Sequence, residues 1–149
     1  MKKSIILMTV FLTVFNVTFV AAAAKLGPRD IPGLITSTYI FAIIFVAVFI
    51  LLATIIANLI KFEGGTNPKD PGKRRLWFWI LAIVAPIAFF IYNYTVIIPS
   101  VKTGPALNKF FMHVPIGSAV VLIVYVASGF ILAKMMSRSK IGNWFPSKK

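Results

Sequence analysis

The side chains that could perform acid–base or metal chemistry are few, and they stand apart from the apolar segments of the chain. The sequence has three carboxylates (Asp30, Glu63 and Asp70), one histidine (His113) and no cysteine. All three carboxylates lie outside the long apolar runs, whereas proton relays and cation sites in membrane proteins keep a carboxylate at membrane depth. A sequence without cysteine excludes thiolate catalysis, disulfides, iron–sulfur clusters and cysteine-ligated zinc.

His113 is predicted to stand at the outer edge of the last apolar segment. An imidazole there could bind haem or a metal, or carry a proton near neutral pH. A bis-histidine haem needs two histidines and a zinc site needs several ligands, so one copy of the chain supplies neither. Met112 fails as a second haem ligand because adjacent residues of a helix do not face each other. We favour an interfacial hydrogen-bonding role, with a haem shared with another subunit as the alternative.

The sequence shows no Ser-His-Asp set, no paired intramembrane carboxylates, no phosphate-binding loop and no metal-ligand spacing. We therefore expect a protein that is not an enzyme, with no catalytic residues, no cofactor and no metal. Of its 149 residues, 59% are hydrophobic, and the formal net charge is +13. The apolar excess is concentrated in uninterrupted runs, which is typical of a bilayer protein. Membrane topology also explains the basic charge better than nucleic-acid binding, because no basic helix or aromatic–basic platform lies outside the runs.

The N-terminal segment 1–24 has two lysines, an apolar core and four alanines, Ala21 to Ala24. This order predicts a bacterial-type secretory signal peptide, cleaved after Ala22, Ala23 or Ala24. The alternative is an uncleaved first transmembrane helix, since about 20 residues are enough to span. Asn16 and several hydroxyl side chains make the signal peptide the preferred interpretation.

The remaining chain, 25–149, is predicted to be a single membrane domain. The fold class is all-α: a polytopic membrane helical bundle with three transmembrane helices after a cleaved signal peptide, or four if it is uncleaved. Two prolines and two glycines in Lys25–Gly33 predict a turn, with Pro32 near the next helix start. The predicted spans are about 34–60, 76–98 and 114–133, joined by a basic loop at 61–75 and followed by a basic tail at 134–149.

Prolines and aromatic residues suggest local features of these spans. Pro86 should kink the second helix near its middle, and Pro115 suits the first turn of the third. Residues 108–113 are expected to lie along the membrane interface. Aromatic side chains that anchor the chain at the membrane interface are expected after the basic loop and in the basic tail. They are Trp77, Trp79, Trp144 and Phe145.

Charge distribution predicts the orientation. Twelve of the sixteen Lys and Arg residues fall in the N-terminus, the 61–75 loop and the C-terminal tail, and four fall on the opposite side. The positive-inside rule makes the first side cytoplasmic. We therefore expect a multi-pass protein of the bacterial inner (cytoplasmic) membrane with a cytoplasmic C-terminus. Its basic surface would include Lys73, Arg74 and Arg75, which could attract anionic lipid head groups.

Small and polar residues mark candidate contact positions within the spans. On the third span a stripe follows helical spacing, and a small-xxx-small pair lies on the first; both favour close helix packing, either internal or against a partner. Pro86 and Asn93, two turns apart on one face, could instead line a polar path. The packing residues are Gly117, Val121, Tyr125 and Ser128, with Ala53 and Ala57.

These features favour a non-catalytic structural or assembly subunit of a multi-protein inner-membrane complex, such as a secretion or conjugation apparatus. The alternatives are a small oligomeric channel or transporter for a neutral or anionic solute, and an accessory subunit of a respiratory complex using His113. An immunity or regulatory protein that binds one membrane partner would show the same sequence features as the assembly subunit. The expected partners are membrane lipids and other membrane proteins or copies of the chain itself, without nucleic acid.

Overall fold

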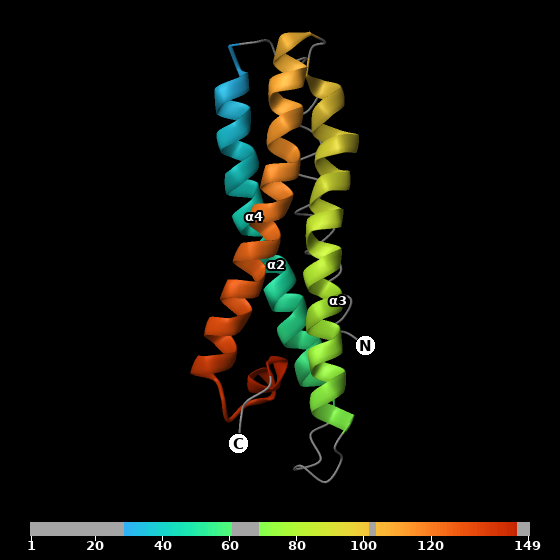
Figure 1. Cartoon of the computed structure of the whole chain (residues 1–149), viewed down its shortest axis with the longest axis vertical. Coiled ribbons are helices and arrows are strands. Elements are labelled where there is room, and N and C mark those ends of the chain that lie inside the picture. The colour runs from blue at the N-terminus through green and yellow to red at the C-terminus, as the bar shows by residue number, and fades with distance from the viewer. Residues whose placement is uncertain (1–28, 61–68, 102–103, 146–149) are drawn as a thin grey trace, which may run out of the picture.

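The computed structural model describes residues 29–60, 69–101 and 104–145, and in these ranges it is an all-α protein without β-strands (Figure 1). The predicted signal peptide, most of the basic loop and the last four residues lie outside the described ranges. The elements are α2 (Ile31–Leu59), α3 (Lys69–Tyr92), the π-helical turn η2 (Asn93–Ile97), the 3-10 turn η3 (Ile98–Ser100), α4 (Pro105–Met135) and the 3-10 turn η4 (Lys140–Trp144).

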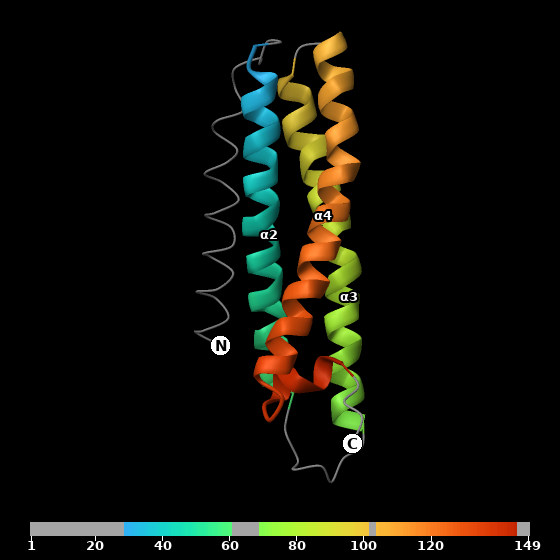
Figure 2. The same cartoon turned by 60° about the vertical axis from the view of Figure 1, so that its left-hand side comes forward.

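The three long helices form one antiparallel bundle. In both views α2 and α4 run in the same direction and α3 runs in the opposite one, and each helix contacts the other two (Figures 1 and 2). We call one end of the bundle the basic end, because α2 and α4 finish there and α3 begins there, with Arg74 and Arg75 in its first turns. The other end is called the histidine end, since His113 lies near it.

All three helices are long and apolar enough to cross a membrane. The spanning segments are Ile31–Leu59, Pro71–Ser100 and Leu107–Met135. At 1.5 Å per residue a helix of 29 residues is about 44 Å long, which exceeds a hydrocarbon core of about 30 Å. The chain is therefore a multi-pass membrane protein whose helices tilt or extend past the hydrocarbon.

The helices begin earlier than the sequence pattern predicted. Part of the expected basic loop, Lys69 to Arg75, is already helical in α3, and α4 starts at Pro105 instead of residue 114. Residues 108–113, expected along the interface, are continuous with α4. Gly104 explains this start, because its φ of 117° suits glycine and Pro105 then occupies the first helical turn.

The prolines illustrate the same difference. Pro32 lies in the first turn of α2, as predicted, but Ile31 and Gly33 are helical too, so the expected turn ends sooner. Pro115 is inside α4 and not in its first turn, and Pro86 is inside α3. Membrane helices tolerate internal proline because neighbouring groups can satisfy the freed backbone carbonyls.

The centre of the core near the basic end is the ring of Phe78 on α3. Tyr125 of α4 stacks on it at a centroid distance of 5.0 Å and Trp144 of η4 at 4.8 Å, with interplanar angles of 23° and 22°. Gly129 of α4 lies directly beside the same ring, so close that a Cβ there would overlap it. Three elements therefore meet at one aromatic side chain.

The C-terminal segment returns into the bundle, which differs from the expected interfacial role of Trp144. Its indole is 0% exposed. The return is stabilised where the Ser139 hydroxyl accepts a hydrogen bond from the Ile141 amide, 3.2 Å, and where Lys140 Nζ donates to the Asn58 carbonyl of α2, 2.9 Å. Trp77 and Trp79, in contrast, are both more than two-fifths exposed, as interfacial residues are expected to be.

Replacing Gly129 with Ala should destabilise the bundle. Phe78 cannot move away from the added methyl because Tyr125 and Trp144 cover its two faces, and overpacking of this kind costs about 1–3 kcal/mol. Thermal unfolding of the purified protein in mild detergent measures the effect. Gly33→Ala is the control, since a Cβ at Gly33 meets nothing within 4 Å. Equal transition temperatures for both variants would contradict this packing.

Replacing Trp144 with Ala should detach the C-terminal segment from the bundle. Truncating a fully buried Trp costs about 3–5 kcal/mol, and the same change at the exposed Trp77 should cost far less. Limited proteolysis after residue 135, followed by intact mass, reports detachment directly. If the Trp77→Ala variant is cleaved as fast as the Trp144→Ala variant, burial of Trp144 does not hold the C-terminal segment on the bundle.

Candidate functional site

Three uncharged polar side chains that are buried inside the bundle lie toward the histidine end. Thr38, Asn93 and Ser100 are buried there. Each donates to a carbonyl about one turn earlier in the chain: Thr38 to Leu34 at 2.9 Å, Asn93 to Phe89 at 2.9 Å and Ser100 to Ile97 at 2.6 Å. These three donors therefore bond nearby backbone carbonyls, which are satisfied in this way in an apolar environment.

His113 makes a side chain–side chain hydrogen bond that joins α4 to α2. Its Nδ1 lies 3.2 Å from the Tyr39 hydroxyl of α2, and the two rings meet edge to face with centroids 6.2 Å apart. The hydroxyl can donate to Nδ1 or accept from it, depending on the tautomer. The pair fastens the start of α2 to α4, and a hydrogen bond to one ring nitrogen orients the other, as in histidines that bind a ligand.

The sequence suggested a polar path along Pro86 and Asn93, and the described residues around Asn93 are closely packed. Asn93 is only 2% exposed and begins the π-helical turn η2. Toward the basic end the interior beyond it is filled by Ala85, Phe89 and Val121, each 0% exposed. Pro86 is half-buried. The helix is irregular at Asn93, yet the packed core behind it is apolar.

The predicted packing stripe lies mainly inside the bundle. Gly117 and Val121 are buried, and a Cβ on Gly117 would stand 3.0 Å from the Phe89 ring. The Tyr125 hydroxyl donates to the Phe78 carbonyl at 3.2 Å and so joins α4 to α3. Ser128 is half-buried. Ala53 and Ala57 on α2 are buried in the same core.

At the basic end, the three residues of the predicted basic surface differ in how exposed they are. Lys73 is exposed and Arg75 is half-buried, whereas Arg74 differs from the expectation because it is 1% exposed. Its Nε donates to the Ala57 carbonyl at 3.3 Å and its Nη2 to the Ile60 carbonyl at 3.0 Å. A cation there complements the negative end of the α2 dipole and satisfies carbonyls that the helix leaves open.

No cluster of three or more His, Cys, Asp or Glu that could hold a metal occurs within ranges 29–60, 69–101 and 104–145. Sequence reasoning placed His113 but missed its partner Tyr39 and the buried roles of Arg74 and Trp144. Tyr39 is 74 residues from His113 along the chain, and no local pattern joins them. For Arg74 a signal existed, because an arginine shortly before a long apolar run can reach the end of the preceding helix.

The Tyr39–His113 contact should appear as an energetic coupling. We expect a double-mutant cycle of Tyr39→Phe and His113→Ala to give a coupling free energy of about 0.5–1.5 kcal/mol, the net value of a hydrogen bond in a folded protein. Thermal or denaturant unfolding in detergent measures it. Tyr94→Phe is the matched control, since Tyr94 is exposed at the same end. A coupling that is no larger with Tyr39 than with Tyr94 would argue against the bond.

Comparison of the chain with protein-family models, with curated proteins and with solved structures finds no match. Its architecture and membrane character therefore rest on its own residues. Those residues form an all-α bundle with three helices that can each span a bilayer.

Proposed function

We propose that this chain is a non-catalytic structural or assembly subunit of a multi-protein complex in the bacterial inner membrane, such as a secretion or conjugation apparatus. The observation that carries the proposal is the closed apolar core. Ala85, Phe89, Val121 and Tyr125 meet in the interior with 0% exposure. A bundle of this kind is a rigid body that offers its outer faces and its two ends to other molecules.

The outer faces support this role because all three helices expose large apolar side chains along the membrane. Lipid covers such faces by default, and three helices leave much of their surface available to partner helices. A channel would need a path between copies of the chain, because a path through one copy would have to cross the packed core. The exposed side chains include Ile43, Leu51, Ile83, Ile87, Ile123 and Ile131.

The charges support the orientation within the proposal. The basic end carries Lys73, Arg74 and Arg75 from α3, and Lys134, Arg138 and Lys140 from the C-terminal region. By the positive-inside rule this end would face the cytoplasm. The Tyr39–His113 pair would then face the opposite compartment.

Native purification of a tagged chain in mild detergent tests the proposal. We expect other envelope proteins to co-purify in fixed stoichiometry, measured by native mass and peptide mass spectrometry. The control is the same preparation of the Trp144→Ala variant, in which a disturbed basic end should weaken any partner that docks there.

A homogeneous homo-oligomer without partner proteins would contradict the assembly role. Flux measurements in proteoliposomes would then compare the natural chain with an Asn93→Leu variant. Loss of flux with retained assembly would assign a channel function in place of the proposed one.

A further inference from the structure

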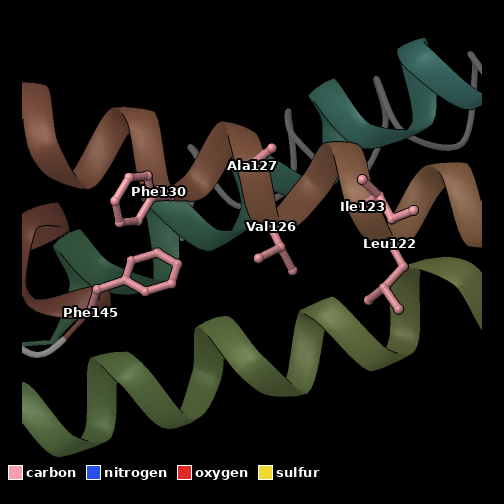
Figure 3. Close-up of a pocket in the computed structure, with 6 residues that line it drawn as sticks. All are labelled: Leu122, Ile123, Val126, Ala127, Phe130 and Phe145. Carbon is pink, nitrogen blue, oxygen red and sulfur yellow. The ribbon is translucent and has the colours of Figure 1, made fainter.

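An apolar groove runs along the membrane-facing side of α4 close to the basic end (Figure 3). Leu122 and Val126 point from α4 toward α3, and Phe145 faces Phe130 at the end nearest the C-terminus, with ring centroids 5.5 Å apart. From Leu122 to Phe130 the helix rises about 12 Å, close to the hydrocarbon depth of one leaflet, about 15 Å. The groove is lined by Leu122, Ile123, Val126, Ala127, Phe130 and Phe145.

Two cations stand where this groove reaches the basic end. Lys134 is four residues beyond Phe130, and residues four apart share a helix face, so it continues the groove on α4. Arg75 is four residues before Trp79, whose ring lies 6.1 Å from that of Phe145. Each of the two helices beside the groove therefore contributes one positive residue at the level where lipid head groups lie.

Carboxylates are scarce on the helices that carry these cations, since Asp70 in the first turn of α3 is the last acidic side chain of the sequence. The sequence contains no Asp or Glu after Asp70, which excludes one from α4, η4 and all but the first residues of α3. Arg75 is half-buried, and its Nε is buried without a hydrogen bond to any described residue. A partly desolvated guanidinium is stabilised by an anion, and phosphate accepts from it in two parallel hydrogen bonds.

We propose that the groove binds one anionic phospholipid, with an acyl chain against the apolar lining and the phosphate against Arg75 and Lys134. An apolar partner helix would fit the lining but would supply no anion to the two cations. A phospholipid supplies an anion for the cations and an acyl chain for the apolar lining. Its phosphate lies at the membrane surface and its acyl chain lies below, which matches the positions of the cations and of the groove.

Lipid titration of the full chain in mild detergent, followed by native mass spectrometry, tests this site. The probes are phosphatidylglycerol and phosphatidylcholine with the same acyl chains. The natural chain should bind one phosphatidylglycerol more tightly than phosphatidylcholine. The Arg75→Gln/Lys134→Gln double variant should bind phosphatidylglycerol about 30-fold more weakly, given the usual contribution of two surface cations, with phosphatidylcholine affinity unchanged. Ala127→Phe, which fills the exposed groove, should weaken both lipids.

The matched control removes two positive charges elsewhere. Lys73→Gln/Lys109→Gln changes the net charge equally, but Lys73 lies two residues from Arg75 on another face of α3 and Lys109 lies at the histidine end. This variant should retain the phosphatidylglycerol affinity of the natural chain. Elution volume and thermal transition identify variants that do not fold, and Ala127→Phe alone carries the test if the Arg75 variant is among them.

Three outcomes would overturn the proposal. Equal affinity of the natural chain for the two lipids would exclude a phosphate site. An equal loss in the Lys73/Lys109 control would indicate diffuse charge attraction. A dimer that Ala127→Phe dissociates, without retained lipid, would show that a second copy of the chain covers the groove.

Discussion

Close contact between small residues and aromatic rings is the constraint on which the bundle depends. Lipid tails are as apolar as the side chains of the helices, so burial from water does not drive helices together inside a membrane, and van der Waals packing must do so. At Gly129 against Phe78 and at Gly117 against Phe89, α4 packs closely on α3. Ala53 and Ala57 allow α2 to join the same core.

The Phe78 ring also explains why the C-terminal segment belongs to the fold. Tyr125 of α4 and Trp144 of η4 both stack on this ring of α3, so the three elements pack together around one side chain. Arg74 adds a polar connection at the same end, because it donates to the last carbonyls of α2. The basic end is consequently a packed structure, and only part of its positive charge is available to other molecules.

The polar groups are placed so that the middle of the bundle remains apolar. Tyr39 and His113 pair near one end, and most of the described arginines and lysines lie at the other. In between, the Tyr125 hydroxyl is bonded to a helix carbonyl and the core around it is otherwise apolar. An interior of this kind is the basis of the proposed assembly role, in which the ends and the outer faces would contact other molecules.

The sequence by itself determined the all-α class, the three apolar helices and their approximate positions, because about 20 consecutive apolar residues have few alternatives to a membrane helix. It also indicated the small-residue stripe, since helical periodicity can be read locally. It did not determine where α3 and α4 begin, because polar residues such as Lys69 and Asn108 can extend a helix beyond the apolar run. Only the tertiary structure decided that Trp144 and Arg74 are buried and that Tyr39 meets His113. Each of these contacts joins residues distant in the chain, and their energies depend on how the helices pack rather than on any local pattern.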